Sequence, residues 1–136
     1  MNKPMKTEIS FASKMENINI IEKIVDEIST QYNFGTEIYG NILVAAVEAV
    51  NNAIIHGNKI DESKSVNVKI EISNNILFIR VKDEGEGFDY NNIADPTLPE
   101  NLEKPHGRGL FLIKHLADEI NFYDKGKELE LKFNIV

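Results

Sequence analysis

The sequence contains no cysteine, so neither a disulfide nor a thiolate metal site can hold its fold together. It also lacks an apolar run of the roughly 20 residues that a membrane helix needs, and Met1 to Glu8 lack the apolar core of a signal peptide. Its lysines stand singly among acidic residues and form no basic stripe of the kind that nucleic-acid binders carry. We therefore expect a cytoplasmic protein that binds no membrane and makes no direct contact with nucleic acid.

The remaining composition is typical of one globular domain. Of the 136 residues, 42% are hydrophobic and 27% are charged, and the formal net charge is −7. A chain of this length can bury a full core, and it shows no internal repeat. We expect a single domain over residues 1–136. The acidic balance favours solubility and does not exclude an anion site, since such a site needs only local donors.

Helical spacing of apolar residues predicts one helix that begins near Ser13 and a second from about Thr36 to His56. Ser13 and Glu16 form an S-x-x-E capping box, which is typical of a helix start. The apolar arc of the second helix is wide, so this helix should be buried on more than one side. A narrow polar sector of it holds Glu48 and Asn52.

Alternating apolar residues predict strands that pair mainly as antiparallel hairpins. These strands cover residues 6–11, 66–72, 77–82, 120–123 and 129–135. An apolar helix over residues 110–117 precedes the last hairpin, and the aperiodic residues 88–106 form a long loop of the kind that is usually functional or mobile. The expected fold class is α+β, a two-layer α/β sandwich whose mostly antiparallel sheet is covered on one face by helices.

Asp83 has the same parity as the apolar positions of residues 77–82, so it continues the buried face of that strand. A buried carboxylate is costly unless it is hydrogen-bonded. The alternative is that the strand ends before Asp83, which then simply opens a turn. Gly85 and Gly87 follow at alternate positions and let the backbone approach a ligand closely. An aspartate at this point could accept a hydrogen bond from an exocyclic amine.

Glu48 and Asn52 are four residues apart and share one helix face. An ionised Glu48 accepts hydrogen bonds and could act as a general base. The neutral amide oxygen of Asn52 suits a hard cation such as Mg²⁺, which needs few protein ligands because it keeps several waters. A solvated polar stripe is the alternative interpretation, and it must explain a polar sector on a broadly buried helix.

The segment His106-Gly107-Arg108-Gly109-Leu110 stands where the third helix begins. Glycines at a helix start expose backbone N–H groups, and the helix dipole favours anions there. The segment could therefore hold phosphate without a P-loop lysine. A plain loop-to-helix junction is the alternative.

The order of these three elements resembles the GHKL superfamily of ATP-binding domains, and within it the anti-sigma-factor serine/threonine kinases. Glu48 to Gly57 (EAVNNAIIHG) looks like their asparagine box, and Val81 to Asp89 (VKDEGEGFD) resembles their first glycine box. The stretches Asp95 to Leu102 and Gly107 to Ile113 are similar to their ATP lid and second glycine box. The resemblance covers nearly the whole chain and implies a Bergerat-type ATP-binding fold.

The resemblance implies a role for each polar site residue, with ATP and Mg²⁺ as cofactors. Glu48 would be the catalytic base that activates a substrate hydroxyl. Asn52 would hold the Mg²⁺ that bridges the phosphates. Asp83 would accept a hydrogen bond from the adenine amine.

The glycine boxes would supply the remaining ATP-binding positions. Gly85 and Gly87 would line the purine and its ribose side. The start of the third helix would hold the phosphates, chiefly through main-chain N–H groups, with Gly107, Arg108, Gly109 and Leu110. Many relatives carry Thr after the glycine that precedes the last strand, whereas Lys127 and Glu128 follow Gly126 here.

The implied reaction is transfer of the γ-phosphoryl group to Ser or Thr of an anti-sigma-factor antagonist protein. The implied partners also include a sigma factor or another client and a second copy of the chain in a homodimer. A non-catalytic module of the same fold, in which nucleotide only sets partner choice, is the alternative. A third possible function is that of an orphan ATPase or a piece of a larger kinase. We expect the chain to be complete, because it runs from a first strand to a last one.

Overall fold

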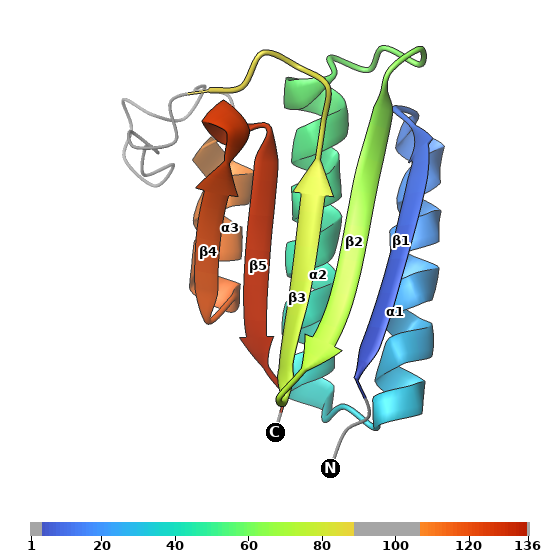
Figure 1. The fold of residues 1–136 in the computed structure, drawn as a ribbon, viewed down its shortest axis with the longest axis vertical. Helices are drawn as coiled ribbons and strands as arrows, with labels where there is room; N and C mark the ends of the chain where they lie inside the picture. Colours follow the sequence, from blue (N-terminus) through green and yellow to red (C-terminus); the bar gives the residue numbers. More distant parts are fainter. Residues whose placement is uncertain (1–3, 89–106, 136) are drawn as a thin grey trace.

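The computed structural model describes residues 4–88 and 107–135, which form a five-stranded sheet with three α-helices on one face (Figure 1). In chain order the elements are β1 (Met5–Ala12), α1 (Ile18–Tyr32), α2 (Thr36–Asn52), β2 (Ser65–Ser73), β3 (Ile76–Lys82), α3 (Gly107–Leu116), β4 (Glu119–Tyr123) and β5 (Glu128–Asn134). The strand order is β1-β2-β3-β5-β4, and every neighbouring pair is antiparallel. The predicted α+β fold, with an antiparallel sheet covered on one face, is confirmed.

The register of the sheet follows the alternation of apolar residues. In the β2–β3 hairpin Ile70 pairs with Ile79, and both side chains are at most 1% exposed. Asn74 and Asn75 form the turn with φ values of 53° and 64°. Two consecutive left-handed residues match the twist of a short hairpin, and asparagine tolerates that conformation. A one-residue slip would move the apolar set to the open face, so the pattern fixes the register.

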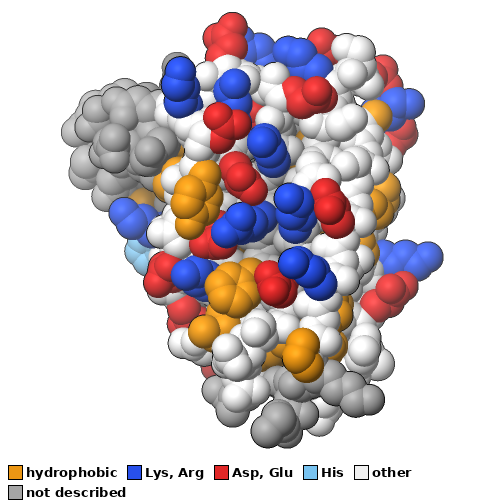
Figure 2. Space-filling model, in the orientation of Figure 1, with side chains coloured by type: hydrophobic (Ala, Val, Ile, Leu, Met, Phe, Trp, Pro, Cys, Tyr) orange, Lys and Arg blue, Asp and Glu red, His pale blue; other side chains and the backbone are white. Residues whose placement is uncertain are grey.

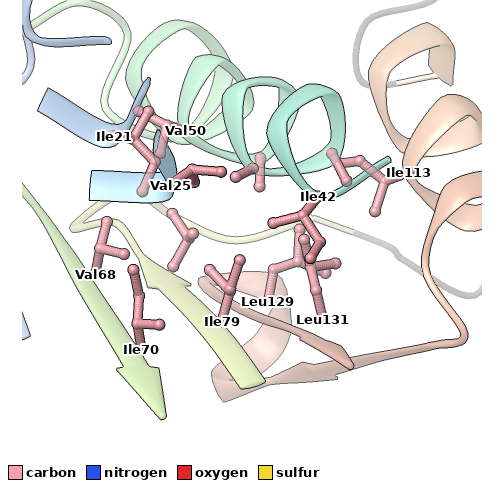
Figure 3. Close-up of a cluster of buried hydrophobic side chains, with 14 of the residues drawn as sticks. Ile21, Val25, Ile42, Val50, Val68, Ile70, Ile79, Ile113, Leu129 and Leu131 are labelled. Atoms are coloured by element: carbon pink, nitrogen blue, oxygen red, sulfur yellow. The ribbon is translucent and has the colours of Figure 1, made fainter. Parts of the chain in front are cut away.

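The core lies between the sheet and the helices (Figure 3). Helix α1 contributes Ile21, Val25 and Ile28 at helical spacing. Burial of each such side chain stabilises the fold by about 1.5–3 kcal/mol. Figure 3 labels ten of the core residues: Ile21, Val25, Ile42, Val50, Val68, Ile70, Ile79, Ile113, Leu129 and Leu131.

Helix α2 is the central helix and contacts both α1 and α3. With the π-helical turn Ala53–Gly57 that extends it, α2 forms a helix of 22 residues that is long and apolar enough to cross a membrane, and an 18-residue stretch of it has a mean hydropathy of 1.4. The expectation that the chain has no such run is therefore wrong. The composition is explained by burial, because Ala45, Ala46 and Ala49 are at most 1% exposed and let the helix pack closely on its neighbours.

The predicted capping box at Ser13 is wrong. A 3₁₀ turn at Met15–Asn17 precedes α1, and its N-cap residue is Lys14, which makes no side-chain capping hydrogen bond. The Ser13 hydroxyl instead donates to the carbonyl of Lys64 at 2.8 Å. The reason is tertiary: Ser13 is completely buried where β1 ends, so its hydroxyl meets a distant partner.

The face of the sheet without helices carries interleaved acidic and basic side chains with apolar patches between them (Figure 2). On this face Glu130 is only 3% exposed, which the alternation of β5 did not predict. Arg80 donates to Glu130 at 2.8 Å, and the hydroxyl of Tyr123 donates to it at 3.3 Å. The predicted loop and ATP lid fall mainly on residues 89–106, which lie outside the described residues.

Candidate functional site

Asp83 directly follows β3, at the edge of the sheet where α2 ends and α3 begins (Figure 1). Its side chain is 8% exposed, so the prediction that it continues the buried face is confirmed. Its Oδ1 accepts a hydrogen bond from the N–H of Gly85 at 2.8 Å. Its own N–H donates to the carbonyl of Lys127 at 2.9 Å. Burial raises the pKa of Asp83, and the hydrogen bond from Gly85 and the charge of Lys127 oppose that rise.

Gly57 and Gly85 pack against Asp83 through bare backbone. A Cβ atom on Gly57 would lie 2.3 Å from Oδ2 of Asp83, and one on Gly85 would lie 2.0 Å from the carbonyl oxygen of Gly57. The π-helical turn brings Gly57 to this place, and the N–H of Asn58 closes it by donating to the carbonyl of Ala53 at 2.8 Å. Such single π turns occur frequently at functional sites. The wall around the Asp83 carboxylate therefore requires glycine at both positions.

Gly87 packs on the turn between β4 and β5. Its φ is +83°, and a Cβ there would lie 2.1 Å from the carbonyl oxygen of Lys125. Gly126 has a φ of +90° and packs in turn on Phe88. The contact of this turn with Asp83 runs through the main-chain carbonyl of Lys127, so it does not depend on the threonine that many relatives carry.

Glu48 lies beside the first turn of α3. A Cβ atom on Gly109 would lie 3.1 Å from Oε2 of Glu48, so the glycine leaves space for the carboxylate. The side chain of Glu48 is half-buried on the flank of α2 that faces α3. The Glu48 carboxylate therefore lies beside the helix start, where main-chain N–H groups are available to an anionic ligand.

Asn52 lies one helical turn after Glu48 and is half-buried. The preceding residue, Asn51, has a side-chain oxygen that is buried with no hydrogen-bond partner among the described residues. Among those residues no group of three His, Asp or Glu side chains could hold a metal. A few neutral oxygens with one carboxylate nearby fit Mg²⁺, which takes most of its ligands from water and phosphate.

Helix α3 begins at Gly107 with no acidic residue in its first turn. Arg108 is exposed, whereas Leu110 is 1% exposed and belongs to the core. Leu110 therefore anchors the start of the helix, and only its main chain is available for a ligand. The first N–H groups of such a helix have no intrahelical partner and attract anions.

Residues 11–133 match the family described as the histidine kinase-like ATPase domain. The chain belongs to this family. The serine-protein kinase RsbW of Oceanobacillus iheyensis is 29% identical over 119 residues, which are 83% of this chain and 75% of that protein. An anti-sigma F factor of Clostridium perfringens is 31% identical over 134 residues, which are 93% of this chain and 94% of that protein. The predicted family and the predicted protein kinase activity agree with these names and are confirmed.

A solved structure supports the fold of this ATPase domain. The RsbU and RsbW domains of Rv1364c from Mycobacterium tuberculosis superpose with a TM-score of 0.70 at 15% identity. The match covers 98% of this chain and 32% of that chain, so our chain spans about a third of its length. At this identity the likeness concerns the fold alone.

The ATPase domain brings the predicted site residues into two groups along α2. Glu48 and Gly109 form one group, and Asp83 with Gly57 and Gly85 forms the other. The positions of Glu48 and Gly57 are about 13 Å apart along the helix axis. That separation suits an extended ligand with an amine-bearing ring at one end and phosphates at the other. The roles assigned to the individual residues remain predictions.

Sequence reasoning missed Asn58, which is 1% exposed and hydrogen-bonded to three segments. Its position after the helix-ending glycine was visible in the sequence, but its partners come from distant strands. The sequence placed Gly57 only at the end of the stretch that resembles the asparagine box, although its contact with Asp83 is the reason that no side chain fits there.

Proposed function

We propose that this domain binds Mg-ATP and transfers the γ-phosphoryl group to Ser or Thr of an anti-sigma-factor antagonist protein. The observation that carries the proposal is the Glu48 carboxylate of α2 beside the first turn of α3, with the buried Asp83 carboxylate packed on Gly57, where the π-helical turn after α2 ends. The first would act in phosphoryl transfer, and the second would recognise a purine amine. Relatives named as serine-protein kinases and anti-sigma factors support this assignment.

Adenine recognition would fall to Asp83. Its Oδ1 is occupied by the N–H of Gly85, so Oδ2, beside Gly57, remains for the exocyclic amine. Gly85 and Gly87 would let the backbone line the purine and ribose. A site that hydrogen-bonds a specific amine rejects analogues that lack it, because the buried acceptor is then left unpaired.

The phosphates would lie against the start of α3, bound by the N–H groups from Gly107 to Leu110 with Arg108 at the exposed rim. Asn52 would hold Mg²⁺, which supplies charge neutralisation and orientation of the phosphates when bound. Transfer of a phosphoryl group depends mainly on such positioning. Glu48 would accept the proton of the substrate hydroxyl as the oxygen attacks phosphorus, with ADP as the leaving group.

A homodimer is part of the proposal, with the sheet face free of helices as its contact. That face carries Phe78 among charged side chains of both signs, including Lys69, Glu71 and Arg80 (Figure 2). A two-fold contact is self-complementary when each patch holds both signs of charge. A sigma factor or another client, bound in the cytoplasm, would be the regulated partner.

The test is incubation with Mg-ATP and a candidate antagonist, followed by phosphosite mapping on the antagonist. The proposal predicts phosphoserine or phosphothreonine with the wild-type chain and almost none with Glu48→Ala. Equal labelling by both proteins would show that Glu48 is not the base. ATP binding without any transferred phosphate would favour the non-catalytic module instead.

A further inference from the structure

Asn58 connects three segments of the chain, and one of them directly follows Asp83. Its Nδ2 donates to the hydroxyl of Ser13 at 2.7 Å and to the carbonyl of Ser65 at 3.0 Å. Its Oδ1 accepts the N–H of Glu84 at 2.7 Å. The orientation of the amide is unambiguous, because a backbone N–H can only donate and a carbonyl can only accept. The side chain is 1% exposed, so water does not compete for these bonds.

These contacts fix the peptide groups on both sides of Asp83. The N–H of Asp83 is held by the carbonyl of Lys127 at 2.9 Å. The next peptide N–H, that of Glu84, is held by Asn58. The direction of a side chain depends on the backbone dihedrals at its own residue, which these two peptides define. Asn58 therefore helps to fix the backbone at Asp83, from which the carboxylate side chain extends.

The local backbone is built to present Asn58 at this place. The π-helical turn ends with the N–H of Asn58, and Lys59 and Ile60 follow with φ values of 54° and 56°. A β-branched residue such as Ile60 is strained in the left-handed region. The N–H of Ile60 closes onto the carbonyl of Ile54 at 2.8 Å, so the chain turns back sharply after Asn58. Strain of this kind persists where the surrounding contacts enforce it.

We propose that Asn58 is a positioning residue for adenine specificity: it holds the Asp83 carboxylate in the orientation that accepts the exocyclic amine. The proposal rests on the proposed function of Asp83. Removal of a residue with only a structural role would lower the stability of the protein and its affinity for all nucleotides to the same extent. A positioning residue would, when removed, reduce the preference for the amine-bearing base and leave phosphate binding intact.

The experiment compares the affinities for ATP and for inosine triphosphate, which carries a carbonyl oxygen in place of the amine. Both are titrated into wild type, Asn58→Ala and Asn17→Ala below the unfolding transition. Asn17 is the matched control, because its Nδ2 also donates to a backbone carbonyl, that of Ala12 at 2.8 Å, and this bond lies at the start of α1 and not in the segment that follows β3.

Asn58→Ala is expected to lower the preference for ATP over inosine triphosphate about tenfold, since one charge-assisted hydrogen bond is misdirected. Its affinity for inosine triphosphate should change less than about twofold, and Asn17→Ala should keep the wild-type preference. If Asn58→Ala lowers the affinities for ATP and inosine triphosphate equally, or leaves the preference for ATP unchanged, the proposed role of Asn58 is wrong. A wild type without any preference for ATP would instead contradict the assignment of Asp83 itself.

A second measurement keeps the proposal testable if Asn58→Ala does not fold. Amide hydrogen exchange of Glu84 in the nucleotide-free wild type should be slow, because its N–H is already held by Asn58. If the Glu84 amide exchanges at the unprotected rate until ATP is added, the backbone beside Asp83 is not oriented before ATP binds, and the proposal is wrong.

Discussion

At the scale of single residues, the site depends on two carboxylates, those of Asp83 and Glu48, which lie in different environments. Asp83 is buried beside backbone, and burial raises its pKa. Glu48 is half-buried on α2 and lies beside Gly109 in the first turn of α3. The first environment suits recognition of a hydrogen-bond donor, and the second would put a carboxylate beside the proposed phosphate site.

Asp83→Asn should separate stability from function. Asparagine can still accept the N–H of Gly85, but it removes a buried charge, so the free energy of unfolding at pH 7 should equal or exceed that of wild type. ATP affinity should fall about tenfold or more, because the amine would face a donor. Urea unfolding and calorimetry measure the two quantities, and a clearly less stable variant with normal ATP affinity would contradict the role assigned to Asp83.

The same group predicts the sign of a pH effect. Because the folded-state pKa of Asp83 is raised, the folded protein binds this proton more readily than the unfolded chain does. The unfavourable contribution of Asp83 to stability is therefore present above its folded pKa and is lost as the pH falls through it. Urea unfolding should show that the difference in the free energy of unfolding between wild type and Asp83→Asn becomes smaller as the pH is lowered. If this difference in the free energy of unfolding becomes larger at low pH, the raised pKa of Asp83 is contradicted.

Glu48→Gln should reduce phosphoryl transfer by about 100-fold or more while ATP affinity changes little, since a general base contributes to the chemical step. The measurement is single-turnover transfer to the antagonist together with an ATP titration. Loss of both activities in parallel would indicate that Glu48 serves binding or folding rather than proton transfer.

At the scale of elements, close contact between the end of α2 and the end of β3 positions the site. The contact is backbone against carboxylate, and it exists because Gly57 and Gly85 lack side chains. Gly40, a third glycine, lies in the same helix and offers a natural comparison, because a Cβ atom added there would meet no other atom within 4 Å.

Gly57→Ala and Gly40→Ala should therefore have opposite effects on stability. The added methyl at Gly57 collides with Asp83 and should cost about 1–3 kcal/mol and most of the ATP affinity. In Gly40→Ala the methyl meets open space, and the helix should gain about 0.5–1 kcal/mol. Thermal and urea unfolding of both variants measure the difference. Tolerance of alanine at Gly57 would show that the two segments are not packed as described.

At the scale of the whole molecule, the sheet is covered on one face only, and the proposed dimer would cover the other. Phe78→Asp, on the open face, should weaken dimerisation at least about tenfold by placing a charge in the contact. Val44→Asp is the control, because Val44 is 41% exposed on the helical layer. Sedimentation equilibrium measures the assembly, and dissociation by Val44→Asp instead would assign the contact to the helices.

The sequence could predict the fold because each element carries its own period. Strand alternation located β2, β3 and β5 and placed Asp83 on the buried face, and helical spacing located α2. The role of Ser13 was predicted wrongly, because its hydroxyl does not cap the helix and instead makes a tertiary hydrogen bond to the carbonyl of Lys64. Glu130 and Asn58 escaped for the same reason, since their burial depends on side chains from other elements.

Calorimetric titration of the wild-type chain with Mg-ATP and with inosine triphosphate tests the proposed nucleotide site most directly. We predict one saturable site with a clear preference for ATP, lost in Asp83→Asn and retained in Glu48→Gln. No saturable heat with ATP, or equal affinity for both nucleotides, would contradict the proposal that these elements converge on a single adenine nucleotide.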